Sequence, residues 1–251
     1  FQTQKAPFDD PRVRKAFSLA IDRTYIVNQV TQSGQVEAGG FVPAGVYDAE
    51  GATGDDFRTV GGDYYKPTDA DYEANCEEAR ALLAEAGYEN GEGFPVVEYL
   101  YNTSDAHKAV AEALQYMWEE ELGVKVTLNN QEWAAFLQTR KDGDYSIARN
   151  GWIADYNDPI SFLDMWMTGG GNNDAQYENE EYDSLIKEAK TTTDVKERME
   201  LLHKAEDKII GEDNALAPLY FYTQKYMLAD GIEGLYYCPL GYFFFGYTHQ
   251  A

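Results

Sequence analysis

Cysteine and histidine are both scarce in this sequence of 251 residues, and their scarcity limits the chemistry that the chain can perform. The two cysteines, Cys76 and Cys238, have no CxxC spacing, which excludes a disulfide-rich mini-scaffold and leaves either free thiols or one long-range bridge. None of the three histidines has a second His or Cys at ligand spacing, so no zinc or other transition-metal site is expected. Nucleophile, zinc-protease, phosphate-loop and dinucleotide motifs are missing as well. We therefore predict a protein that has no cofactor and is not an enzyme.

Basic residues are also few. Lysine and arginine number 20 against 44 aspartates and glutamates, which gives a net charge of −24. Such a charge repels nucleic acids and anionic membranes, so we expect no nucleic-acid partner; it suits either attraction of cationic ligands or a purely solubilising surface. No run reaches the ~18 consecutive apolar residues of a membrane-spanning helix. The chain begins at Phe1 without a signal-like segment, which predicts a removed leader or a part of a longer protein.

The remaining composition, 44% hydrophobic and 25% charged, is typical of a folded chain of one or two domains. Asp10 followed by Pro11 predicts a capped helix start, and Gly87 predicts a helix end. Between them, residues 33–67 form an irregular stretch that suits either a binding loop or a plain surface excursion. Apolar spacing predicts helices at residues 11–21, around 26–27, and at 71–87, 107–122, 132–140, 182–189 and 195–210.

The middle of the chain predicts an α/β fold. Residues 96–101 (VVEYLY) form an expected strand, and Ser104 or Asp105 is expected to cap the helix that follows. Residues 124–128 (VKVTL) alternate apolar and polar side chains, which predicts a second strand. A strand, a helix and a strand in this order form a βαβ unit, which is nearly always a right-handed parallel crossover. This unit is the expected nucleus of the domain.

A third strand is expected at residues 145–149, followed by a turn at residues 151–159 (GWIADYNDP). Ligands of open α/β sheets usually bind at the carboxyl ends of strands, so this turn is a candidate binding segment. Further along, residues 216–222 and 225–228 are expected to be buried strands. The aromatic tail includes residues 242–247 (YFFFGY), an uncharged run of high β-propensity that predicts self-association of the chain when it is exposed.

Several groups suited to a zwitterionic ligand gather around these strand ends. Tryptophan offers a flat apolar wall, arginine pairs with carboxylates through a forked guanidinium, and an aspartate in a turn can pair with an ammonium group. A histidine in the first turn of a helix adds a further partner for a carboxylate. Each residue alone also has an ordinary structural role, as a core tryptophan, a surface ion pair or a polar helix start. The candidates are His107, Trp133, Arg140, Arg149, Trp152 and Asp155.

Longer segments resemble a known family. The stretches DPRVRKAFSLAIDR, LYNTSDAHKAVAEAL, NQEWAAFLQTRKDGDYSIARNGWIADYNDPISFL and APLYFYTQKYML are similar, in this order, to the periplasmic oligopeptide-binding proteins of bacterial ABC importers (extracellular solute-binding protein family 5). The resemblance covers essentially the whole chain and implies a periplasmic-binding-protein-like (type II) α/β lobe, with a mixed sheet flanked by helices. Family members are longer and hold a peptide between two lobes. The resemblance thus implies that residues 1–222 are the carboxyl-terminal peptide-binding lobe, and residues 223–251 a returning segment of the first lobe, whose remainder is absent.

The resemblance also assigns roles to the candidate residues. It implies that Asp155 pairs with the α-amino group of a bound peptide. Three cations would meet the peptide's carboxyl terminus at different peptide lengths: Arg140, Arg149 and His107. Two tryptophans would form walls of side-chain pockets, Trp133 and Trp152, and two neighbours complete the ligand-binding set, Asn102 and Tyr156. Residues 29–38 lack the lysine that family members can offer to a shorter peptide, so the preferred peptide length stays open.

The function that the resemblance implies is capture without chemistry. Two lobes close over an oligopeptide outside the cytoplasmic membrane, and the closed protein delivers it to the ABC permease. The implied location is the periplasm or, for a lipoprotein, the cell surface. One alternative is a receptor of the same fold for another ligand, such as a nickel chelate or a sugar. Alternatives from a different class are a peptide hydrolase and a chaperone.

Overall fold

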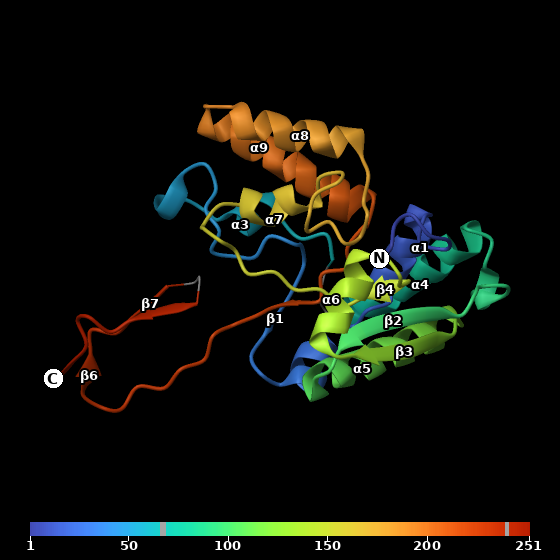
Figure 1. Cartoon of the computed structure of the whole chain (residues 1–251), viewed down its shortest axis with the longest axis horizontal. Coiled ribbons are helices and arrows are strands. Elements are labelled where there is room, and N and C mark those ends of the chain that lie inside the picture. Colours follow the sequence, from blue (N-terminus) through green and yellow to red (C-terminus); the bar gives the residue numbers. More distant parts are fainter. Residues whose placement is uncertain (66–68, 239–240) are drawn as a thin grey trace.

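A three-stranded parallel sheet lies at the centre of the chain. The computed structural model describes residues 1–65, 69–238 and 241–251. The strand order is β3-β2-β4, with bounds β2 (Val97–Asn102), β3 (Val126–Gln131) and β4 (Ile147–Ala148). The helix α5 (Asp105–Leu122) connects β2 to β3 along the sheet, and the carboxyl ends of the three parallel strands meet at one edge (Figure 1). This is the βαβ unit, extended by one strand, that the sequence predicts.

Local sequence signals account for the bounds of α5. The side chain of Ser104 accepts a hydrogen bond from the backbone N–H of His107 and caps the helix, and Gly123 ends it in the left-handed conformation (φ 67°). The buried face repeats at helical spacing: Val110, Leu114, Met117, Trp118 and Leu122. The indole N–H of Trp118 donates to the carbonyl of Phe17 over 2.8 Å, so its polar atom is satisfied inside the core.

The amino-terminal helices pack against α5 and against one another. They are α1 (Pro11–Leu19), α2 (Arg23–Tyr25), the π-helical η1 (Ile26–Thr31), α4 (Asp69–Glu85) and the short 3-10 turn η3 (Glu89–Gly91). Asp10 caps α1 by accepting from the N–H of Arg12, as the Asp-Pro pair predicts. Gly87 adopts a φ of 96°, which only glycine tolerates easily, and the chain turns there after α4. The helix predicted around residues 26–27 is present as η1, which directly follows α2.

The irregular stretch at residues 33–67 is fastened to the body by one buried ion pair. Its regular elements are β1 (Val36–Glu37), η2 (Gly51–Thr53) and α3 (Phe57–Gly61), while residues 66–68 lie outside the described residues. Both carboxylate oxygens of Glu206 accept from the guanidinium of Arg58, at 2.8 and 2.9 Å. Oε1 also accepts the backbone N–H groups of Phe41 and Val42, at 2.8 and 2.9 Å. Glu206 is fully buried, so four donors converge on a carboxylate without access to water.

A second group of helices follows the sheet in sequence. It consists of α7 (Ile160–Leu163), the 3-10 turn η4 (Asp164–Trp166), α8 (Glu180–Thr191), α9 (Val195–Glu206) and the π-helical η5 (Asp207–Glu212). Asn179 and Asp194 cap α8 and α9. The two helices lie side by side at the end of the molecule away from the sheet, with α7 and α3 beneath them (Figure 1). The helices predicted here are present, and the last turn of the second is η5.

The prediction of two buried strands within residues 216–228 is largely wrong. Only β5 (Tyr220–Phe221) forms, and it pairs antiparallel with β1 on half-buried residues. Residues 225–228 form no strand and are exposed, with Met227 97% accessible. An apolar run predicts burial only where another segment covers it, and residues 225–228 are exposed.

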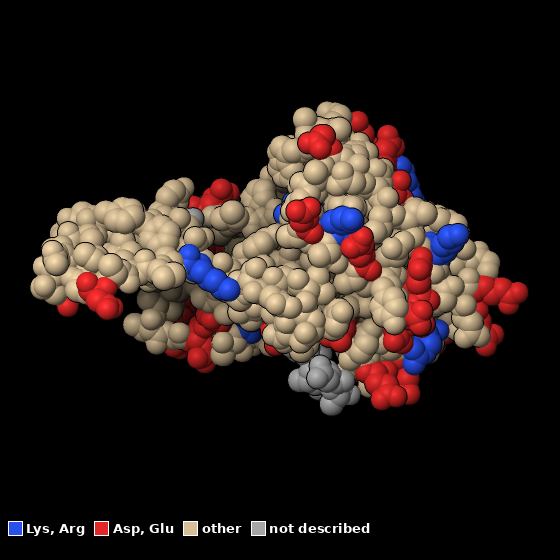
Figure 2. Space-filling view, turned by 90° about the horizontal axis from the view of Figure 1, so that it is seen from below, with Lys and Arg blue, Asp and Glu red and all other residues tan. Residues whose placement is uncertain are grey.

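Residues 223–251, which we call the arm, extend away from the body (Figure 1). The arm contains β6 (Ile232–Glu233), β7 (Tyr236–Cys238), β8 (Tyr242–Phe244) and β9 (His249–Gln250), paired antiparallel as β6 with β9 and β7 with β8; residues 239–240 lie outside the described residues. Its rings pack mainly on one another, as Tyr237 does on Phe243 with centroids 5.0 Å apart. Figure 2 shows a face on which the arm is nearly uncharged while acidic side chains are spread over the body. Cys238 in the arm and Cys76 in the core are both free, so the long-range bridge left open by the sequence is not formed.

Candidate functional site

The carboxyl edge of the parallel sheet brings together two residues that are 47 positions apart in sequence, Asn102 and Arg149. Asn102 is the last residue of β2. Arg149 follows β4, and its backbone N–H donates to the carbonyl of Leu100 over 2.9 Å, which continues the ladder past the end of the strand. Because parallel strands end at the same edge, the two side chains emerge next to each other. The parallel pairing of β2 with β4 therefore accounts for the contact between these two predicted site residues.

The guanidinium of Arg149 has weak neutral partners in place of a carboxylate. Nη1 donates to Oδ1 of Asn102 over 3.3 Å, and Nη2 donates to the hydroxyl of Tyr222 over 3.4 Å. Both distances are at the long end of the range for hydrogen bonds. Across residues 1–65, 69–238 and 241–251, Arg149 forms no ion pair. A half-buried cation without a counter-ion is a ready partner for the carboxylate of a ligand.

His107 lies beside this cation, in the first turn of α5. Burial, and secondarily the charge of Arg149, lower the pKa of the His107 imidazole below its ordinary value, and a hydrogen bond to the backbone of Asn102 opposes them only in part. Its Nδ1 atom is buried and has no hydrogen-bond partner among the described residues. Burial and the neighbouring charge therefore both favour the neutral form of the imidazole. An anion bound next to it would favour the protonated form.

Arg140 differs from Arg149 because its charge is already paired. Nε donates to Asp174 over 2.6 Å, and both side chains are only 13% exposed. Nη1 donates to Asn150 over 2.9 Å and to the backbone carbonyl of Arg149 over 3.3 Å. Arg140 therefore supports the segment that carries Arg149, and its predicted contact with a ligand stays a prediction.

The two candidate tryptophans have different surroundings. Trp133 begins α6 (Trp133–Lys141) at the end of β3, stacks on Phe136 with centroids 5.8 Å apart, and remains 52% exposed. Trp152 is half-buried against the core, and its indole N–H donates to the carbonyl of Ser161 over 2.7 Å. An exposed flat ring at a strand end can stack on an apolar side chain of a ligand. Trp133 thus has the free surface that its predicted role requires, while Trp152 offers only part of its ring.

Asp155 lies in the turn that precedes α7. Its backbone N–H donates to Oγ of Ser161 over 2.9 Å, and its side chain is exposed. Tyr156 beside it is 50% exposed, and burial followed by the negative charges of Asp164 and Asp158 raises the pKa of its hydroxyl. The candidate site is thus divided into a cationic group at the sheet edge (Asn102, His107 and Arg149) and an acidic turn further along the chain.

A family model described as bacterial extracellular solute-binding proteins, family 5 (middle region), matches residues 1–174. The chain belongs to this family. Its sequence-predicted assignment is therefore confirmed, and the family is one of solute-binding proteins.

Individual relatives agree with this assignment. The periplasmic oligopeptide-binding protein OppA of Salmonella typhimurium is 39% identical over 231 residues, which cover 92% of this chain and 40% of the relative. The dipeptide-binding protein DppE of Bacillus subtilis is 38% identical over 244 residues, covering 96% and 43%. The crystal structure of Haemophilus influenzae OppA in complex with RPPGFSPFR superposes with a TM-score of 0.76 at 33% identity, over 93% of this chain and 44% of that one. The predicted fold is thus confirmed, and the chain spans less than half the length of these relatives.

Tyr222 was not identified from the sequence as a candidate site residue. Tyr222 reaches Arg149 from a segment 73 positions away, and its ring meets that of Tyr220 edge to face at 5.3 Å. The sequence placed it in a buried strand, where a tyrosine is unremarkable. No local spacing connects it to Arg149, so only the fold could reveal the contact.

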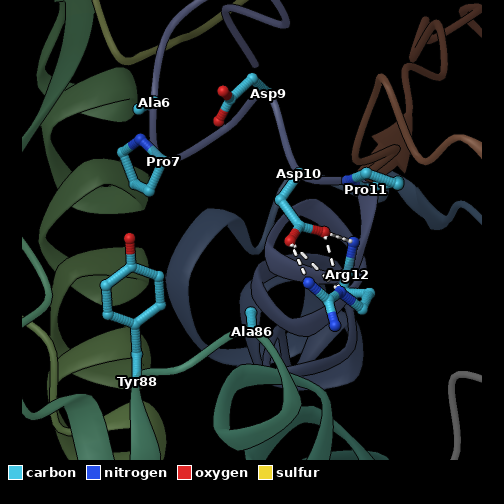
Figure 3. A pocket seen from close by; sticks show the side chains of 8 residues that line it. All are labelled: Ala6, Pro7, Asp9, Asp10, Pro11, Arg12, Ala86 and Tyr88. Carbon is cyan, nitrogen blue, oxygen red and sulfur yellow. Dashed lines mark hydrogen bonds and ion pairs between the residues drawn. The ribbon is translucent and has the colours of Figure 1, made fainter.

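Two surface hollows of this family 5 chain are lined by residues outside the candidate set. The larger of the two has a volume of about 650 Å³. Figure 3 shows that Asp10 in this hollow is already paired with Arg12 and that Tyr88 points toward Pro7. Its lining is Ala6, Pro7, Asp9, Asp10, Pro11, Arg12, Ala86 and Tyr88. Within the described ranges, no group of three or more His, Cys, Asp and Glu side chains could hold a metal ion, and no helix combines the length and apolarity needed to cross a bilayer.

Proposed function

We propose that the chain is the peptide-binding lobe of the substrate-binding component of a peptide ABC importer. In this proposal residues 1–222 form the carboxyl-terminal lobe, and the arm belongs to the first lobe, whose remaining residues lie outside this chain. The protein captures oligopeptides in the periplasm, or at the cell surface as a lipoprotein, and delivers them to the permease. Support comes from relatives named for oligopeptide and dipeptide binding, and from coverage of only 40% and 43% of their lengths.

The observation that carries the proposal is the unpaired cation at the sheet edge. Arg149 holds only long bonds to neutral groups, and His107, whose neutral form is favoured, lies next to it. A peptide carboxylate would replace these weak partners with a charge-assisted, forked pair. The exposed carboxylate of Asp155 supplies the opposite charge for the peptide's amino group. A pair of opposite charges held apart by a short segment is what an extended zwitterion requires.

The direct test uses the full-length protein, in which the chain is joined to its first lobe. The protein is incubated with a peptide pool and examined by native mass spectrometry. Intact bound peptides are expected. Cleaved peptides would support a hydrolase instead, and a bound solute of another class would support a different receptor of the same fold.

Arg149→Ala in the full-length protein is expected to weaken binding of tripeptides more than of longer peptides. A fixed cation can meet the end of only one length of extended chain at about 3.3 Å per residue, and Arg149 is the candidate cation closest in sequence to Asp155. Loss of a charge-assisted hydrogen bond costs about 1.5–3 kcal/mol for the matching length. Calorimetry with tri-, tetra- and pentapeptides measures the pattern.

His107→Ala is the companion variant and should affect a different length most. Arg80→Ala is the control, because Arg80 pairs with Glu121 on the surface of α4 and α5, away from the sheet edge. Equal losses at all three lengths for Arg149 and His107 would rule out a division of labour by length.

The isolated chain is expected to self-associate through its arm. The arm exposes aromatic side chains that the missing lobe would cover, including Phe245 at 67% and Tyr247 at 84%. Deleting residues 236–251 should leave a folded and more soluble domain, since the buried core lies outside this segment. Light scattering gives the association state, and circular dichroism gives the folded content.

A length-preserving control replaces Phe245 and Tyr247 by serine, which should reduce association without shortening the chain. A strictly monomeric 251-residue chain that binds peptides with micromolar or tighter affinity would contradict the assignment of the arm to another lobe.

A further inference from the structure

The turn that carries Asp155 is tied to helix α9 by an arginine outside the candidate site. Nη1 of Arg198 donates to Oδ2 of Asp158 over 2.8 Å, and Nη2 donates to Oδ1 over 2.9 Å. Both side chains are mostly buried, with 20% and 24% of their surfaces exposed. Oδ1 of Asp158 also accepts the backbone N–H of Ile160 over 3.0 Å, at the start of α7. Two parallel bonds of this kind fix direction as well as distance, unlike a single surface contact.

Asn157 ties the same turn to the long irregular stretch. Its Oδ1 accepts the backbone N–H of Tyr47 over 2.8 Å, and its Nδ2 donates to the backbone carbonyl of Gly45 over 3.0 Å. Gly45 is itself held, because its N–H donates to Asp56 over 2.6 Å. The side chain of Asn157 thus bonds two backbone groups of one loop at once.

These contacts attach the acidic turn to a different part of the lobe from the cations. Arg149 continues the parallel sheet through its bond to Leu100, whereas Asp158 and Asn157 bond to α9 and to the loop at residues 45–47. Neither bond involves the sheet. Together with the bonds of Trp152 and Asp155 to Ser161, the contacts at Arg198 and Asn157 therefore contribute to the position of Asp155 relative to Arg149.

We propose that Arg198 and Asn157 are positioning residues for the ligand's amino group. They hold the turn in place, so that Asp155 is already ordered when the amine binds. Because no ordering cost is then subtracted from the binding free energy, the affinity for peptides with a free amino terminus is higher. The inference rests on the proposed function, since it assumes that Asp155 binds the amine. It adds two residues that touch no ligand and that lie two and 43 positions beyond Asp155 in sequence.

The test compares a tripeptide with its N-acetylated form on the full-length protein, by calorimetry. Wild type should prefer the free amine, and Asp155→Ala should abolish that preference. Arg198→Ala and Asn157→Ala should each lower the preference about tenfold, as expected when an outer partner of a charged ligand contact is removed. Arg198→Lys keeps the charge but cannot form the two parallel hydrogen bonds to Asp158, so its effect should be intermediate. Arg80→Ala, in a surface pair away from the turn, is the matched control and should change nothing.

The ratio of the two affinities separates positioning from general stability, because a merely destabilised protein loses both peptides equally. Hydrogen exchange on the 251-residue chain gives a second measurement: Arg198→Ala should speed exchange in residues 152–157 relative to Arg80→Ala. Unchanged preference together with unchanged exchange would overturn the inference while leaving the proposed function intact. A wild type that binds no peptide, or that shows no preference for the free amine, would overturn the role of Asp155 and the inference with it.

Discussion

Asp155→Ala is expected to weaken peptide binding by the full-length protein about 30-fold to several thousandfold. Removing one member of a desolvated, hydrogen-bonded charge pair costs about 2–5 kcal/mol, because the partner left behind stays buried without a counter-charge. In this chain the carboxylate is exposed, and in the proposed complex the first lobe would enclose it with the peptide amine. Calorimetric titration of the variant and the wild type with the same peptide measures the loss.

N-acetylated peptides provide the internal control for Asp155. They carry no amine charge, so wild type should bind them less tightly than free peptides, and Asp155→Ala should remove this difference. Asp9→Ala is the matched variant, because Asp9 is an exposed aspartate in the hollow near the amino terminus. If wild type binds acetylated and free peptides equally well, Asp155 does not bind the amine.

Glu206→Ala is expected to lower the free energy of unfolding of the chain by about 3–5 kcal/mol, the cost of breaking a buried ion pair by removing one partner. Glu206 is fully buried and accepts from Arg58 and from the N–H groups of Phe41 and Val42. Alanine would remove the two short bonds of the buried Arg58 guanidinium, which would keep the longer contact to Asp63 at 3.7 Å, and would leave the two backbone donors without their acceptor. Urea unfolding followed by circular dichroism measures the difference.

Three further variants serve as controls for the stability loss expected of Glu206→Ala. Glu206→Gln keeps the shape and one acceptor oxygen, so its loss should be smaller. Replacing Arg58 and Glu206 together by methionine should cost less than Glu206→Ala, because no charge remains unpaired. Glu121→Ala breaks the surface pair with Arg80 and should change stability by less than about 1 kcal/mol. Equal losses for Glu206→Ala and Glu121→Ala would mean that the buried pair contributes no more than a surface pair.

The parts of the fold that the sequence predicted are those determined by short segments. The capping Ser104, the stop at Gly123 and the spacing of apolar residues between them determine α5 with little help from the rest of the chain. The hydrogen bonds from the backbone of residues 41–42 to Glu206 could not be predicted, since Glu206 lies 165 positions beyond Phe41 in sequence. The strand expected at residues 225–228 was wrong because burial depends on a covering segment, which this part of the sequence cannot report.

In the candidate site as well, the residues could be predicted from short segments, whereas their long-range contacts could not. Asn102 and Arg149 were each predicted as ligand-binding residues, but their contact was not predicted, since it depends on the pairing of β2 with β4 in one parallel sheet. The pairing of Arg140 with Asp174 was not predicted, because the two residues are 34 positions apart and no local spacing connects them. The role of Arg198 could not be predicted, because in the sequence it is one of many polar residues on an amphipathic helix. Its contact with Asp158 depends on the position of the turn at residues 151–159 in the folded chain.

The unequal burial of the four tryptophans gives the chain an internal optical probe. Trp118 and Trp166 are at most 2% exposed, and Trp152 is half-buried with its N–H bonded, whereas Trp133 keeps 52% of its surface in water. Indole fluorescence moves to shorter wavelength when water is removed from the ring. Covering the strand-end face, by a ligand or by a second lobe, would therefore change the emission of Trp133 against a steady background from the two core indoles. Closure of the protein could be followed in real time without any attached dye.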